Sequence, residues 1–139
     1  MADQHPTDTD IMFAGYAGLF DIPDADRDVI RRGAFAASLA QRSTKLPLLW
    51  QHNPNQQIGE IESIAEDERG LRVIARITSR ESRGAAMLRA NEVSGLSFGY
   101  RARQARHSDA GRELLEIDIF EVSLVTEPLQ YGARVHLKT

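Results

Sequence analysis

The chain has 139 residues, of which 42% are hydrophobic and 27% charged, and 17 Lys and Arg against 20 Asp and Glu give a formal net charge of -3. This length favours one domain, and the ordinary composition excludes an intrinsically disordered chain. Because it contains no Cys, a disulfide framework, a thiolate nucleophile and a Cys-ligated zinc site are excluded, which fits a reducing compartment.

The beginning of the chain is polar and acidic, unlike a secretory signal, and no run approaches the roughly 18 apolar residues of a membrane helix. We expect residues 1–10 to form a flexible N-terminal tail and residues 11–139 to form a single domain. Apolar runs and turn residues then predict, in chain order, a strand over 11–20, a loop over 21–28, a short helix over 33–42, a strand over 46–51 and a break at 53–57.

The second half of the chain is predicted to alternate between strands and one helix. The alternation of Leu71, Val73, Ala75 and Ile77 with more polar residues indicates a half-exposed strand. The expected elements are a mixed strand over 58–67, a hairpin turn over 67–70, a strand over 71–78, a helix over 79–90 capped by Ser79 or Ser82, a strand from residue 95, a turn over 107–113 and a strand over 114–126.

These elements predict an α+β fold that is mainly β. About six or seven strands and two short helices suggest a small mixed-to-antiparallel sheet, and closing this sheet would remove its exposed edges. We therefore expect a small closed β-barrel with two or so flanking helices.

His52 is the first candidate for chemistry, because it follows the apolar residues Leu49 and Trp50 at the end of a predicted strand. Rigid backbone there would hold an imidazole at the rim of a cleft, as a general base requires. The alternative is a strand-end histidine that only hydrogen-bonds the following turn.

Ser97 is the second candidate, framed by Gly95 and Gly99. The glycines permit close approach of a backbone or substrate and would leave main-chain N–H groups for an oxyanion. A serine hydroxyl needs a base to become a nucleophile, and His52 is the candidate partner. The letters match G-x-S-x-G, but a predicted strand lacks the strand-to-helix turn of that motif. The alternative is a small solvated serine on the outer face of a strand.

Glu121 is the third candidate, predicted to share a mostly apolar strand face with Ile119. A carboxylate there is costly unless it is paired, and a histidine that becomes cationic is a suitable partner whose tautomer the carboxylate would fix. The alternative is a salt bridge to an arginine. Asp118 and His136 are the other candidates for this position.

Other classes of site lack support in the sequence. The chain has no H-E-x-x-H, calcium loop, phosphate loop or dinucleotide fingerprint, so we expect no metal and no cofactor. His5, in the tail, and His107, in a charged turn, are expected to be solvated. The acidic balance, with one small basic group at Arg101, Arg103 and Arg106, argues against nucleic acid as a partner.

In their order, several segments resemble the prohead proteases of HK97-type tailed phages and their relatives in prophages and gene-transfer agents. The resemblance covers nearly all of the chain after residue 11. The matching segments are GYAGLFD (15–21), DVIRRGAF (28–35), LPLLWQHNP (46–54), IGEI (58–61), RGLRVIARI (69–77), GLSFGYR (95–101) and FEVSLVTEP (120–128).

The resemblance implies a fold like that of the herpesvirus assemblins and a serine endopeptidase of capsid maturation. It makes His52 the general base, Ser97 the nucleophile and Glu121 the third member, although the assemblins use a second histidine in that last role. It implies action in the bacterial host cytoplasm, inside the procapsid, on scaffold segments of the major capsid protein and on the protease itself, with no membrane involved. The alternative is a catalytically silent, protease-like module that binds capsid or scaffold protein.

Overall fold

The computed structural model describes residues 10–139, so the predicted tail over 1–10 lies almost entirely outside the described residues. Eight strands and two short helices follow one another along the chain. They are β1 (Ile11–Leu19), β2 (Asp28–Ile30), α1 (Ala36–Ala40), β3 (Pro47–Trp50), β4 (Asn53–Glu66), β5 (Gly70–Ile77), α2 (Arg83–Arg89), β6 (Gly95–Ser108), β7 (Gly111–Val125) and β8 (Val135–Lys138).

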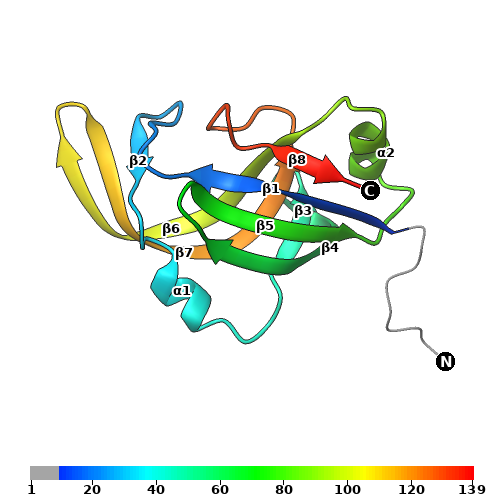
Figure 1. Cartoon of the computed structure of the whole chain (residues 1–139), viewed down its shortest axis with the longest axis horizontal. Helices are drawn as coiled ribbons and strands as arrows, with labels where there is room; N and C mark the ends of the chain where they lie inside the picture. The colour runs from blue at the N-terminus through cyan, green and yellow to red at the C-terminus, as the bar shows by residue number, and fades with distance from the viewer. Residues whose placement is uncertain (1–9) are drawn as a thin grey trace.

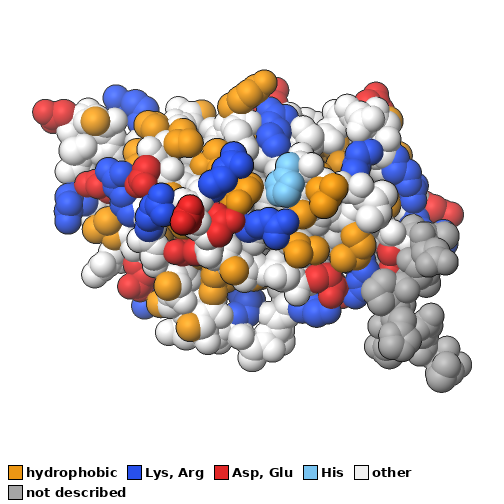
Figure 2. All heavy atoms as spheres, viewed as in Figure 1, with side chains coloured by type: hydrophobic (Ala, Val, Ile, Leu, Met, Phe, Trp, Pro, Cys, Tyr) orange, Lys and Arg blue, Asp and Glu red, His pale blue; other side chains and the backbone are white. Residues whose placement is uncertain are grey.

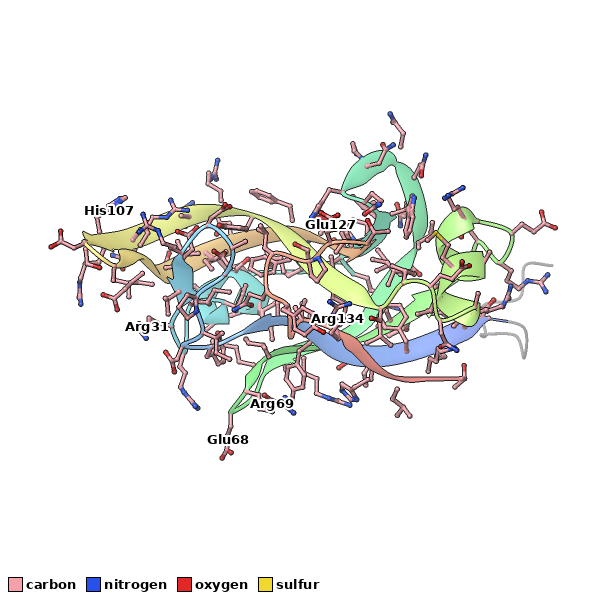
Figure 3. All side chains as sticks on the ribbon, turned by 90° about the horizontal axis from the view of Figure 1, so that it is seen from above. Arg31, Glu68, Arg69, His107, Glu127 and Arg134 are labelled. Carbon is pink, nitrogen blue, oxygen red and sulfur yellow. The ribbon has the colours of Figure 1, made fainter. Side chains whose placement is uncertain are left out.

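All eight strands belong to one sheet in the order β2-β7-β3-β4-β5-β1-β8, with β6 pairing with β7. The sheet curls so that the β6–β7 hairpin lies across β1 and β5, and the end of that hairpin extends beyond the rest of the molecule (Figure 1). The view from above shows the two layers with side chains between them (Figure 3). The core therefore lies inside the curl of a single sheet.

The expected closed barrel is wrong, because β6 does not complete a ladder with β1 or β8. The segment before β8 lies between them: the Leu96 N–H donates to the Ala133 carbonyl, and the Val135 N–H donates to the Ser94 carbonyl. Between this segment and β6, the pairing amounts to one isolated β-bridge, which joins Gly95 and Arg134. The mainly β class and the two helices are confirmed, whereas the closure inferred from edge protection is not.

A single-residue β-bulge explains why the sequence of β4 does not alternate regularly. In β4, Ile61 pairs with Ala75 and Ser63 pairs with Ile74, so Glu62 is an extra residue that reverses the alternation of the strand. This accounts for the mixed pattern over 58–67. The uninterrupted alternation in β5, with Leu71 and Val73 fully buried, is confirmed.

Several predicted boundaries need correction. The break at 53–57 is wrong, because β4 already begins at Asn53. The turn over 107–113 shrinks to the residues between Ser108 and Gly111. The helix over 33–42 shortens to α1, since Gly33 has φ +87°. The strands β2 and β8, of three and four residues, were not predicted.

The two helices begin in different ways. Ser82 caps α2 by accepting a hydrogen bond from the Ala85 N–H at 3.2 Å, which confirms one of the two expected caps. The start of α1 uses a distant side chain instead, because the Glu66 carboxylate accepts from the Gly33 and Phe35 N–H groups at 2.8 and 2.9 Å. Because Glu66 belongs to β4, the second contact also fixes the start of α1 against the sheet.

Phe35 anchors the core next to α1. Its side chain is fully buried and its ring lies 5.2 Å from that of Phe98 and 6.4 Å from that of Phe20. We expect Phe35→Ala to lower the free energy of unfolding by about 3–5 kcal/mol, because it removes buried surface and leaves a cavity. Guanidinium denaturation measures the change. Phe120→Ala is the matched control, since Phe120 is 49% exposed and should change the stability by less than about 1 kcal/mol.

Candidate active site

His52 lies in the two-residue loop of the hairpin that β3 and β4 form. Trp50 pairs with Asn53, so Gln51 and His52 are the loop residues, and their φ angles are +55° and +59°. Positive φ at both positions is the feature of a type I′ turn, which normally selects Asn and Gly. Left-handed backbone costs a residue with a side chain about 1–3 kcal/mol. The structure therefore holds His52 in a conformation that must be stabilised from outside the turn.

β7 supplies that stabilisation. The Gln51 side chain and Thr126 form two reciprocal hydrogen bonds of 3.1 Å, and the Gln51 N–H donates to the Leu124 carbonyl at 3.0 Å. The His52 N–H donates to the Ser123 hydroxyl at 3.0 Å. These contacts fix the turn against a strand that lies about half the chain away in sequence.

The imidazole of His52 contacts the carboxylate of Glu121. The His52 Nδ1 lies 2.6 Å from Glu121 Oε1, and the two side chains are 44% and 11% exposed. The hydrogen bond that His52 donates to the Glu121 carboxylate raises the pKa of His52, and partial burial of the ring opposes this shift. An ionised carboxylate can only accept, so this contact assigns the Nδ1 proton and leaves Nε2 of the neutral ring as a proton acceptor.

Glu121 reaches His52 because of a bulge in β7. Gly99 pairs with Glu121 but Tyr100 pairs with Ile119, so Phe120 is the extra residue. The predicted apolar face shared by Glu121 and Ile119 is therefore wrong: beyond the bulge the core residues are Val122 and Leu124, and Glu121 lies on the opposite face.

The carboxylate of Glu121 occupies the space that a side chain at Gly99 would need. A Cβ there would lie 2.6 Å from Glu121 Oε1. Instead of the backbone or substrate expected at this glycine, the Glu121 side chain makes the close approach.

Ser97 lies on the same face as this cluster. It pairs directly with Ser123 across the β6–β7 ladder, which places the two Cβ atoms about 4.5–5.5 Å apart. Ser97 is 7% exposed, so it is not the solvated serine of the alternative interpretation. Among the described residues its hydroxyl makes no hydrogen bond, and none joins it to the His52 ring. The structure brings His52 and Glu121 into contact and places Ser97 beside them.

The other residues considered for the third position lie elsewhere. Asp118 binds Arg103 at 3.1 Å and Arg101 at 3.5 Å in the β6–β7 hairpin. His136 lies in β8 with its ring 5.8 Å from that of Tyr16. Neither contacts His52, and the partner of Glu121 is a histidine rather than an arginine.

The surface of the β6–β7 hairpin carries both basic and acidic side chains. His107 lies near its far end, as Figure 3 shows, and is exposed as expected. Arg106 pairs with Glu113 at 3.6 Å, and on the face drawn in Figure 2 basic and acidic side chains are interspersed. Within residues 10–139, no helix is long and apolar enough to cross a membrane, and no group of three or more His, Asp or Glu is placed to hold a metal.

The family model of the caudovirus prohead serine proteases matches residues 1–139. The chain belongs to this family. It is 34% identical over 132 residues to the prohead protease of Enterobacteria phage HK97, covering 89% of this chain and 58% of that protein. It is 29% identical over 124 residues to the capsid polyprotein of Pseudomonas phage PAJU2, covering 81% of this chain and 18% of that protein. The chain thus spans little more than half of the first relative.

Solved structures share the fold of this prohead protease family member. The protease of Kaposi's sarcoma-associated herpesvirus, in complex with a hexapeptide phosphonate inhibitor, has a TM-score of 0.65 at 14% identity and covers 94% of this chain and 65% of that one. The varicella-zoster virus protease has a TM-score of 0.56 at 18% identity and covers 91% and 63%. The assemblin-like fold implied by the sequence is confirmed.

Sequence reasoning missed the residues that hold the site of this prohead protease family member together. Gln51 and Thr126 are polar residues beside strand ends, and nothing in their local pattern marks them. The reversal of faces at Phe120 is also invisible to simple alternation. A signal for Ser123 did exist: it is a serine within the apolar run Val122 to Val125.

Proposed function

We propose that the chain is a serine endopeptidase of capsid maturation in which His52 is the general base, Ser97 the nucleophile and Glu121 the residue that orients the base. The observation that carries the proposal is the contact of His52 Nδ1 with Glu121, on the sheet face where Ser97 pairs with Ser123. A base, its orienting acid and a serine then lie within one small cluster.

The chemistry follows from the tautomer that Glu121 selects. Nε2 of His52 takes the Ser97 hydroxyl proton as Oγ bonds to the scissile carbonyl carbon, and the imidazolium then gives that proton to the leaving amine as the C–N bond breaks. Water, deprotonated by the same ring, hydrolyses the acyl-enzyme and restores the Ser97 hydroxyl. The Ser97–His52 hydrogen bond needed for the first step forms when substrate binds, as catalytic hydrogen bonds are often long without it.

The substrates we propose are scaffold segments of the major capsid protein and the protease itself. The names of the relatives, a prohead protease and a capsid polyprotein, support this class. The place of action is the procapsid in the bacterial cytoplasm. Confinement there would raise the local concentration of substrate, so strong binding of the cleavage site is not required.

A fluorophosphonate probe tests the proposal, because it forms a covalent bond only with a serine that an adjacent base activates. We expect one adduct, on the peptide that carries Ser97. Labelling should be lost in Ser97→Ala and slowed by at least about 10²-fold in His52→Ala. Mass spectrometry of the digested chain locates and quantifies the adduct.

Ser63→Ala is the control for this experiment, because Ser63 is an exposed serine of β4 outside the cluster. It should label like the parent chain. A folded chain that takes no label would contradict the proposal and favour a silent assembly module instead. A label on Ser123 would show that Ser123, and not Ser97, is the nucleophile.

A further inference from the structure

Ser123 is a fully buried polar residue in the middle of an apolar strand segment. It is 0% exposed, as are its neighbours Val122 and Leu124. A buried hydroxyl is tolerated when it is hydrogen-bonded. The partners of this one explain why it lies there.

The Ser123 hydroxyl joins the two residues of the proposed base–acid pair. It donates to Glu121 Oε2 at 2.5 Å and accepts from the His52 N–H at 3.0 Å. Glu121 Oε1 contacts His52 Nδ1 at 2.6 Å. The three residues therefore form a closed ring of hydrogen bonds. In this ring Ser123 binds the backbone N–H of His52, and Glu121 binds its imidazole.

Only a group that donates and accepts at the same position can close this ring. A hydroxyl has one donor hydrogen and two acceptor lone pairs, and Ser123 uses both functions. With Oε2 held by Ser123, the carboxylate of Glu121 cannot rotate without breaking a buried hydrogen bond, and Oε1 stays directed at the imidazole. The bond to the His52 N–H simultaneously holds a residue whose φ is +59°.

Ser123 is not itself placed to act as a nucleophile. Its side chain has no exposed surface, and its hydrogen is directed to a carboxylate rather than to a nitrogen of the His52 ring. Ser97, its partner across the ladder, retains some exposure, and its hydroxyl makes no hydrogen bond to the residues that the structure describes. Ser123 therefore acts on the reaction through other residues.

We propose that Ser123 is a positioning residue of the peptidase, whose hydroxyl fixes the backbone of His52 and the carboxylate of Glu121 in the geometry that proton transfer requires. This rests on the proposed function for its effect on cleavage. The effect of Ser123 on the His52 side chain does not depend on the proposed function, because it can be measured in a variant that does not cleave.

The test is therefore an NMR titration of the His52 imidazole in the Ser97→Ala background. Glu121 is the charged group that acts on this ring among the described residues. In Ser97→Ala/Ser123→Ala the carboxylate is released, its hydrogen bond to Nδ1 weakens, and the pKa of His52 should fall toward its ordinary value. An unchanged pKa of His52 in the folded double variant would overturn the proposal.

Activity gives the second readout. In the otherwise unchanged chain we expect Ser123→Ala to lower kcat about 10²-fold with little change in KM, because a displaced base affects chemistry more than binding. Ser123→Thr, which keeps the hydroxyl, should restore most of kcat and the raised pKa of His52. Full activity of Ser123→Ala would reject the positioning role.

Ser38→Ala is a matched control. Like Ser123, Ser38 accepts a hydrogen bond from a backbone N–H, in its case that of Ile119 at 3.1 Å, and this bond also involves β7; Ser38 does not contact His52. It should leave the pKa of His52 unchanged even where it lowers stability. If Ser38→Ala shifts that pKa as much as Ser123→Ala does, loss of a hydrogen bond to β7 is a sufficient cause and the proposal fails.

Amide exchange in the Ser97→Ala chain covers the case in which Ser123→Ala does not fold. The His52 N–H should exchange slowly with solvent, because its acceptor is fully buried. Fast exchange at His52, with slow exchange at its neighbours in β3, would overturn the proposal without any substitution at Ser123.

Discussion

Ser97→Ala is expected to lower cleavage of a co-expressed capsid precursor at least about 10⁴-fold, because a serine protease without its nucleophile retains only the contribution of binding and oxyanion stabilisation. The fold should be retained. The Ser97 hydroxyl makes no hydrogen bond to the described residues, so its removal leaves no buried group unpaired. Gel analysis of precursor and product, with the melting temperature of the purified variant, measures both expectations.

Ser63→Ala, the exposed β4 serine used above, serves again as the control and should process the precursor at the parental rate. Processing by Ser97→Ala at a rate within about tenfold of the parent would reject Ser97 as the nucleophile. Loss of processing together with a large fall in melting temperature would instead show that Ser97 has a structural role.

Glu121→Gln is expected to lower kcat about 10²–10⁴-fold with the geometry largely retained. The amide NH₂ of glutamine can donate to Nδ1 of His52, which would then carry the lone pair and leave the proton on Nε2. A ring in that tautomer cannot accept the Ser97 proton. Steady-state kinetics on a peptide substrate measures the loss. Glu116→Gln, in the same strand, is the control and should have little effect.

The pH dependence of the Glu121 effect has a defined sign. A histidine base works when neutral, so kcat/KM should rise with pH through the raised pKa of His52. In Glu121→Gln that pKa falls, and the rising limb should move to lower pH. A limb that stays in place would show that Glu121 does not act on His52.

Stability should follow the same linkage. The pKa of His52 is raised in the folded chain, so the pair contributes its full stabilisation below the unfolded pKa and loses it as pH rises through the folded one. Glu121→Gln should therefore destabilise the chain more near pH 6 than near pH 9, as denaturation at the two pH values would show.

The sequence indicates the candidate residues of the site more clearly than it indicates their surroundings. His52 and Ser97 stand out because a polar residue interrupts an apolar or glycine-framed segment, and their order along the chain supports the family resemblance. The presence of a helix around Ser38 and the alternation of β5 follow from local pattern, although α1 is shorter than predicted. Glu121 contacts His52, but the apolar face on which it was selected does not exist, because the bulge at Phe120 turns Glu121 to the other face.

The remaining features depend on contacts between distant segments. The closed barrel was wrong because edge protection is a general tendency, whereas the segment around Arg134 covers the edge of β6 with a few backbone hydrogen bonds. The three-residue β2 exists only through its parallel pairing with β7. The left-handed Gln51–His52 turn is the clearest case, since local propensity disfavours it and contacts with β7 determine it.

The Gln51–His52 turn depends on contacts with β7, a strand that is synthesised much later than the turn. The hydrogen bonds that hold His52 in place join residues 71 and 69 positions apart in the sequence, so a nascent chain that has produced only β3 and β4 has no means of aligning the imidazole. On the proposed function, the site cannot form until β7 has been synthesised and has paired with β3.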